Sequence, residues 1–310
     1  MGSRSNEYDV SLEIKTTDPQ AVHAEINRIY RDLYQGAPTE KLDQAFRDMA
    51  LLYNGEYPGF HPCDTAYHDT QHVLDVTLAM ARLISGYERG RIGVEPMDDK
   101  LFRLGVITAL FHDCGYVQEL SDQTHKNGAE MTLTHVSRGS HFLKEYLPKI
   151  GMADMADVAS ELIHFTGYET KVDKIIVTAP IYRLLGTMLC SADIIAQMAD
   201  RCYLEKCRDR LYPEFVLGGL ATRRAPDGGE QVVYASGLDL VMKTPDFFLG
   251  ARKRLDGDLG ASHNFAHRHF GGQNVYLDEV EKNIKFAREI RKEGEKAATL
   301  NRLPPNLLKE

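Results

Sequence analysis

The sequence predicts an all-α protein that folds as a single domain. Apolar residues recur with a helical period along most of the chain, and only residues 231–234, after the turn signal at 226–229, are strand-like. No Ser/Gly-rich linker, internal repeat or low-complexity run divides the 310 residues. We therefore expect one helical domain over residues 18–300, between a flexible N-terminus at 1–17 and a C-terminal tail at 301–310.

Capping residues and helical spacing place the expected helices. Asp18 and Pro19 begin a helix that extends to about residue 34, because Pro is favoured in the first turn. Thr39 begins a second helix, which ends near residue 55. Further helices are expected at 68–86, 98–113, 127–147, 153–165, 180–210 and, as a charged amphipathic end, 273–299.

Composition limits the classes of partner. The net charge is −8 and there is no Trp, so neither a nucleic-acid groove nor an anionic membrane surface is indicated. An acidic surface still allows an anionic substrate, because a bound metal can dominate the local field. We expect a small-molecule substrate, and the sequence leaves a homodimer open.

The cysteines and the apolar runs indicate a compartment. The chain has 5 Cys, an odd number without CxxC spacing, which argues against a disulfide framework and a zinc ribbon. No apolar run reaches the roughly 18 to 20 residues of a membrane span, and the first residues lack the apolar core of a signal peptide. We expect a reduced, cytoplasmic protein.

Two segments carry the strongest chemical pattern. His68 and His72 are four residues apart, so on a helix they would share one face. His112 and Asp113 directly follow an apolar run, which places a carboxylate at the end of a buried helix. Such a carboxylate is costly without a partner or a metal. Imidazole and carboxylate together suit divalent transition metals, although His68 and His72 could also be ordinary surface or core-edge histidines.

Three further residues are weaker candidates. Asp193 lies within an apolar helical segment, where it needs either a metal or an ion pair with Arg183 or Arg201. His135 lies one turn before Gly139, and His164 ends an apolar run. Each of these two histidines, taken alone, is better explained as a structural histidine held by a hydrogen bond.

These positions together resemble a known family. His72, His112-Asp113 and Asp193 resemble the ligand series of the HD-domain metal-dependent phosphohydrolases. Residues 67–76, 189–194 and 208–215 are similar to three segments of their cyclic-nucleotide phosphodiesterases. His135 with Gly139 resembles a segment shared with HD-GYP cyclic-dinucleotide phosphodiesterases. The resemblance covers residues 65–216 and implies a helical bundle of the HD-domain type, with helical N- and C-terminal extensions.

The resemblance implies an activity and a role for each residue. The expected enzyme is a phosphodiesterase acting on a nucleotide, foremost a 3',5'-cyclic nucleotide, through a metal-activated water. Two divalent ions (Mn, Fe, Mg or Zn) would be held by His72, His112, Asp113, Asp193, His135 and His164. Asp113 would bridge the two ions and His68 would protonate the leaving oxygen. Gln273, Tyr276 and Arg138 are expected to contact the substrate.

The sequence also departs from both subfamilies, and other functions stay open. Cys114-Gly115 follows His112-Asp113 where the cyclic-nucleotide phosphodiesterases continue HDxDHxG, and residues 164–168 lack the second His and the Pro of the HD-GYP motif. Alternatives are an HD-GYP-like or other nucleotide phosphohydrolase, an HD-fold diiron oxygenase with the same ligand types, and a non-catalytic nucleotide-binding module.

Overall fold

The computed structural model describes residues 5–225 and 228–308, and the all-α prediction is confirmed. Helices make up most of these residues, and their one sheet is a two-stranded antiparallel hairpin. In it β1 (Thr222–Arg224) pairs with β2 (Glu230–Val232), with Thr222 opposite Val232. The strand predicted at 231–234 therefore exists and begins one residue earlier.

The first four helices are close to their predicted positions. Asp18 caps the first, its carboxylate accepting from the backbone N–H of Gln20 at 2.9 Å. The second begins after Thr39 and ends before Asn54. Their bounds are α1 (Pro19–Leu33), α2 (Glu40–Tyr53), α3 (Thr70–Gly90) and α4 (Asp99–Leu110).

The middle of the chain is more broken than the sequence predicts. The helix expected at 127–147 is a 3-10 turn followed by α5, and the helix expected at 153–165 is α6 between two 3-10 turns. The elements are η1 (Cys114–Tyr116), η2 (Gly128–Met131), α5 (His135–Lys149), η3 (Ala153–Met155), α6 (Ala156–Leu162), η4 (Ile163–Phe165) and η5 (Val172–Lys174).

A close backbone approach joins two of these elements. A Cβ on Gly115 would lie 1.9 Å from the carbonyl oxygen of His135, so η1 can pack against the start of α5 only because residue 115 is Gly. This contact brings the segment after Asp113 against the beginning of the helix that carries His135.

The long helix predicted over 180–210 ends early. α7 (Pro180–Ala199) stops where Asp200 adopts an extended ψ of 133°, and the Asp200 carboxylate accepts from the backbone N–H of Cys202 at 2.6 Å. A new helical segment follows as α8 (Tyr203–Lys206), the π-helical η6 (Cys207–Leu211) and α9 (Tyr212–Leu217). This turn redirects the chain, so that α9 can approach the loop before α3.

The sequence did not predict the helical region between 237 and 269. Pro245 and several glycines interrupt its apolar period, yet Ser236 caps its first helix by accepting from the backbone N–H of Asp239 at 3.1 Å. The elements are α10 (Gly237–Lys253), the π-helical η7 (Arg254–Asp258), η8 (Ser262–Asn264) and α11 (Phe265–His269). The predicted C-terminal helix follows as α12 (Val275–Lys292) with the 3-10 segment η9 (Gly294–Thr299).

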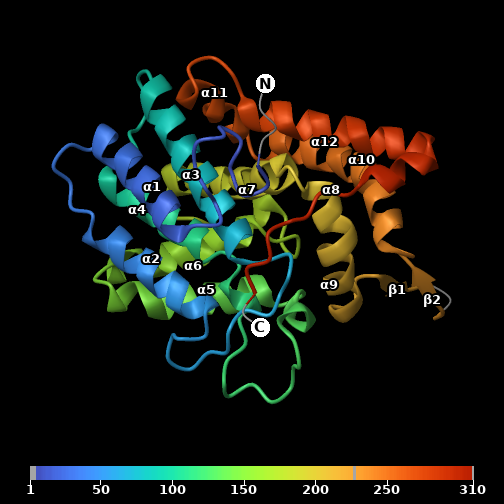
Figure 1. Cartoon of the computed structure of the whole chain (residues 1–310). Coiled ribbons are helices and arrows are strands. Elements are labelled where there is room, and N and C mark those ends of the chain that lie inside the picture. The colour runs from blue at the N-terminus through green and yellow to red at the C-terminus, as the bar shows by residue number, and fades with distance from the viewer. Residues whose placement is uncertain (1–4, 226–227, 309–310) are drawn as a thin grey trace.

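Helix α3 is the centre of the molecule. It packs against α1, α4, α7 and α11, and most of its residues are buried (Figure 1). Helices α10 and α12 pack against each other, and the hairpin extends beyond them at the edge of the molecule (Figure 1). The buried hydrophobic residues form one continuous core that includes residues from α1 to α12. Within the described residues, no helix is both long and apolar enough to cross a membrane.

The N-terminal segment is folded against this core, which differs from the flexible N-terminus expected at 1–17. Asp9 is buried and pairs with the buried guanidinium of Arg82 on α3, with 2.6 Å between Oδ2 and Nη1. The tail also packs, because Arg210 donates to the carbonyl oxygens of Pro304 and Pro305 at 3.0 and 2.6 Å. Residues 1–4, 309 and 310 lie outside the described residues.

Candidate metal centre

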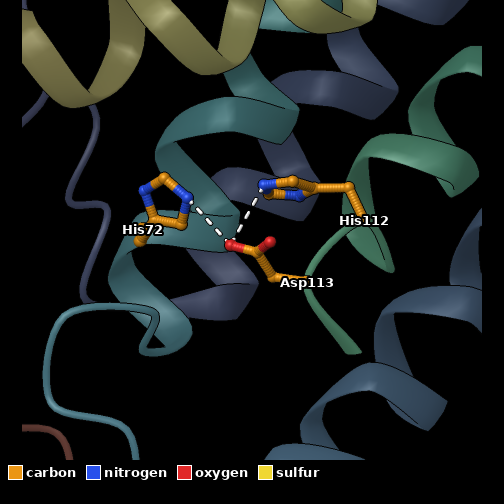
Figure 2. A group of neighbouring side chains, drawn as sticks. All are labelled: His72, His112 and Asp113. Atoms are coloured by element: carbon orange, nitrogen blue, oxygen red, sulfur yellow. Dashed lines mark ion pairs between the residues drawn. The ribbon is translucent and has the colours of Figure 1, made fainter. Parts of the chain in front are cut away.

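Three buried side chains meet at one point of the fold. His72 lies in the first turn of α3, where its backbone N–H donates to the cap residue Asp69 at 3.0 Å. His112 and Asp113 lie in the turn between α4 and η1. The Asp113 Oδ2 atom is 3.1 Å from Nε2 of His72 and 3.2 Å from Nε2 of His112 (Figure 2). This group has the composition and the spacing to hold a metal ion.

The hydrogen bonds leave metal-binding atoms free in this group. The Nδ1–H of His112 donates to the carbonyl oxygen of Ala109 at 2.8 Å, which leaves the lone pair of the neutral ring on Nε2. The buried His112 Nε2 and Asp113 Oδ2 have no hydrogen-bond partner of acceptable geometry within the described residues. Buried polar atoms without partners are costly, and an ion between them would satisfy both. The residues therefore fit a metal.

The charges of His72, His112 and Asp113 also favour a bound cation. Burial opposes protonation of His112, but the negative charges of Asp113 and Asp193 raise the pKa of His112 to about 9. Burial would raise the pKa of Asp113, but the charge of His112 and the contacts with His112 and His72 hold it well below its ordinary value. Asp113 is thus a buried carboxylate that requires positive charge beside it.

Asp193 approaches the group from α7. Its Oδ1 atom is 3.7 Å from Nε2 of His72 and 4.0 Å from Nε2 of His112. The side chain of Gln197, one turn later, donates to the same oxygen at 3.1 Å and accepts from the Tyr67 hydroxyl at 3.1 Å. This chain of hydrogen bonds orients Asp193 toward the histidines and is the geometry expected around a ligand.

The alternative of an ion pair between Asp193 and Arg183 is not realised. The Arg183 guanidinium donates to the carbonyl oxygens of Val172 and Ile175 at 2.9 and 2.5 Å. The pairs that the structure does give Asp193 are the two contacts with His72 and His112.

His135 faces the other oxygen of Asp113. Its Nε2 atom is 3.8 Å from Oδ1, whereas His72 and His112 approach Oδ2. The Nδ1–H of His135 donates to the carbonyl oxygen of Thr132 at 2.7 Å, and burial lowers the pKa of the ring. The ring is therefore neutral near pH 7, with its lone pair directed toward Asp113. The two oxygens of Asp113 divide the imidazoles into two groups.

His164 is not brought to this centre. It is in η4 and is not among the residues that line the cavity beside the metal group, although Thr166 and Gly167 shortly after it are. Helix α6 ends at Leu162, and η4 follows it directly. Within the described residues His164 makes no ion pair with Asp113, unlike His135, and its place in a second metal site stays a prediction.

His68 lines the cavity from the loop before α3, and not from a helix as the sequence predicted. It precedes Asp69, the cap of α3, so His68 and His72 are not on one helical face. The His68 Nδ1 atom is 2.6 Å from Oε2 of Glu214, and the ring stacks on Tyr116 with centroids 4.2 Å apart. Burial would lower the pKa of His68, but the charge and hydrogen bond of Glu214 raise it. The other ring nitrogen, Nε2, is left for the cavity.

The three residues expected to contact substrate lie elsewhere. Gln273 is exposed and donates to Asp278 at 2.5 Å. Tyr276 is buried in the first turn of α12, where its hydroxyl accepts from Arg82 at 3.0 Å. The Arg138 guanidinium donates to the carbonyl oxygens of Gly115 and Val117 at 2.9 and 3.3 Å and thereby holds η1 against α5. None of the three lines the cavity within the described residues, so the structure does not bring them to it.

One cavity of about 480 Å³ contains the metal group and the residues around it. It is lined at one end by His68, His72, Asp113, His135 and Asp193. Its volume is in the range of small-molecule sites, which makes it a candidate active site.

Sequence reasoning missed four residues of this site, namely Tyr116, Glu169, Gln197 and Glu214. Glu214 lies in the segment whose resemblance to the phosphodiesterases was noted, and Tyr116 in the segment after His112, so a signal existed for both. Gln197 stands four residues after Asp193 and could have been found by helical spacing. Nothing in the local sequence marks Glu169.

The chain matches no protein-family model and no curated protein.

Proposed function

We propose that this protein is a metal-dependent phosphodiesterase of the HD-domain phosphohydrolase type. The observation that carries the proposal is the position of Asp113, which offers Oδ2 to His72 and His112 and Oδ1 to His135. A carboxylate presented in this way can bridge two ions, as the resemblance implies. A phosphodiester placed between such ions and a proton donor is suited to hydrolysis.

The ligand sets proposed for the two ions are unequal. His72, His112, Asp193 and Oδ2 of Asp113 would hold the first ion, and His135 with Oδ1 of Asp113 would hold the second more openly. Mixed imidazole and carboxylate ligands suit Fe, Zn and Mn, while a site with fewer imidazoles also accepts Mg. The two ions, when bound, lower the pKa of water and neutralise the phosphoryl oxygens.

The chain's own groups complete the reaction. An oxygen from water forms a bond to phosphorus in line with the leaving oxygen, one proton of that water passes to solvent, and the bond from phosphorus to the leaving oxygen breaks. His68 gives the leaving oxygen its proton from Nε2, while the Glu214 carboxylate on Nδ1 keeps the ring protonated and fixed. A linear diester gives an alcohol and a phosphate monoester, and a cyclic diester opens to one molecule that carries both groups.

The presence of the His68–Glu214 pair also bears on the alternatives. A diiron oxygenase has the same ligand types but less need of a proton donor to a leaving alkoxide, and a binding module needs none. The substrate expected from the resemblance is a nucleotide, foremost a 3',5'-cyclic one, but its base would not be held by Gln273 or Tyr276.

The test is turnover of bis(4-nitrophenyl) phosphate by metal-stripped protein reloaded with Mn, Mg, Fe or Zn, beside a cyclic nucleotide. Release of nitrophenolate that depends on the metal and is lost in Asp113→Asn supports the proposal. No turnover with any of the four metals would overturn it, and Mössbauer spectra of the iron-loaded protein would then test the oxygenase.

A further inference from the structure

Part of the cavity wall is apolar. Five hydrophobic side chains line it from four elements, and we name this part the apolar chamber: Ile194 of α7, Leu211 of η6, Phe215 of α9, and Leu240 and Phe247 of α10. Tyr234, which follows β2, also lines the cavity, and its ring lies 5.5 Å from that of Phe215. The chamber and the metal group share one cavity, so a single ligand can occupy both.

Three polar side chains of the cavity wall, Lys243, Thr244 and Gln197, already have partners within the protein. Lys243 donates to the carbonyl oxygen of Val233 at 2.7 Å and to Asp239 at 2.8 Å. The Thr244 hydroxyl donates to the carbonyl oxygen of Val241 at 2.7 Å. The amide of Gln197 is engaged with Asp193 and Tyr67. A ligand edge rich in donors and acceptors would have to break these bonds, which disfavours recognition of a base by its edge.

The mouth of the cavity is also apolar. Leu133, Tyr168 and Phe247 line it and are 65%, 70% and 44% exposed. Single exposed apolar residues are ordinary on a surface, but these three gather at the entrance of one cavity. Apolar surface rimming a concave site indicates an apolar ligand.

Charge limits the ligand further. Among the described residues that line the cavity, Lys243 is the one Lys or Arg, and it is paired with Asp239. Acidic side chains (Asp113, Asp193 and Glu169) line the other end. A second phosphate group would find no free cation here, whereas the single charge of a diester can be neutralised by the proposed ions.

We propose that the substrate is a singly charged phosphodiester, one of whose two alcohols carries an apolar alkyl or aryl group that fills the apolar chamber. This inference rests on the proposed phosphodiesterase activity and gives it a substrate class. In the reaction water adds its oxygen to phosphorus and releases one proton to solvent, the other alcohol leaves with a proton from His68, and the apolar alcohol stays on the phosphate monoester.

The test is a series of 4-nitrophenyl phosphodiesters whose second alcohol is methanol, butanol, phenol or thymidine. The leaving group is constant, so differences in kcat/KM report the second alcohol alone. Each methylene buried in the chamber should raise kcat/KM roughly fourfold, so the butyl ester should exceed the methyl ester by tenfold or more. The phenyl ester should also exceed the thymidine ester.

A substitution in the apolar chamber provides a second test of the proposed substrate class. Phe247→Ala should reduce kcat/KM for the butyl and phenyl esters about fivefold to tenfold and leave the methyl ester within about twofold. Leu249→Ala is the matched control, because Leu249 lies on the same helix, is 62% exposed and does not line the cavity. A flat series, or a thymidine ester that is the best substrate, overturns this inference while the activity itself stands. If no ester is hydrolysed, the proposed function fails.

Discussion

Oε2 of Glu214 lies 2.6 Å from Nδ1 of His68, although 146 positions separate the two residues. The other oxygen of Glu214 accepts from the backbone N–H of Tyr67 at 2.5 Å. One carboxylate therefore fixes both the ring of His68 and the loop that carries it. This contact joins α9 to the loop before α3 and holds the His68 ring at the wall of the cavity beside the candidate metal centre.

The pair predicts a dependence on the leaving group. His68→Ala should keep its metal and lose roughly 10²- to 10⁴-fold in kcat on a diester with an alkyl leaving group, which needs a proton. On a 4-nitrophenyl ester the loss should be far smaller, because nitrophenolate leaves without one. Equal losses on the two substrates would remove His68 from the role of general acid.

Replacing the carboxylate should move a pH profile. Glu214 raises the pKa of His68, and a general acid acts only while protonated, so activity on the alkyl ester falls as pH rises through that pKa. Glu214→Gln lowers the pKa of His68, and the alkaline loss of kcat should therefore begin at lower pH. Exposed Glu145→Gln, remote from the cavity lining, is the control. An unshifted alkaline limb in Glu214→Gln would contradict the coupling.

The metal content of variants can distinguish the roles of Asp113, His135 and His164. Asp113→Asn should deplete metal and abolish activity, since it removes the carboxylate charge that both groups of imidazoles face. His135→Ala should reduce bound metal from two ions toward one, and His164→Ala should leave it unchanged. Elemental analysis of protein purified in parallel measures all three. Metal loss in His164→Ala alone would reverse the assignment.

Metal affinity should depend on pH through His112. The pKa of His112 in the metal-free protein is raised to about 9, and a metal must displace the proton on Nε2. Below that pKa, each unit by which the pH falls should weaken the apparent metal affinity about tenfold. Binding should release one proton. Titrations with Zn²⁺ between pH 6 and 8 in buffers of different ionisation enthalpy measure both quantities. An affinity independent of pH would show that His112 binds no metal.

The packing of the N-terminal segment makes a prediction about stability. Asp9→Ala leaves the buried Arg82 without its carboxylate and should lower the free energy of unfolding by about 3–5 kcal/mol in a denaturant titration. Burial opposes the charged form of Asp9, but Arg82 and the backbone N–H groups of Ile14 and Ser11 lower its pKa. Its contribution is therefore present above the unfolded pKa and lost as pH falls through the folded pKa. Glu7→Ala, at an exposed pair with Lys15, should change little.

The sequence by itself determined the helical class and the main metal candidates. Apolar periodicity and capping residues are local, so the first four helices could be placed to within a few residues. The cost of burying Asp113 at the end of an apolar helix is also visible locally, and it identified His112 and Asp113 as a pair. The apolar residues around Asp193 in the sequence likewise identified it as a candidate metal ligand.

Tertiary structure decided the rest, because contacts across the chain have no local signature. Only the folded structure shows that His135 faces the second oxygen of Asp113 and that His164 does not. It also shows that the Tyr276 hydroxyl accepts a hydrogen bond from the buried Arg82. The break at Asp200 lets α9 turn back, and Glu214 thereby meets His68. Helix α10, whose pattern Pro245 interrupts, is stabilised by packing on α12 and forms a wall of the apolar chamber.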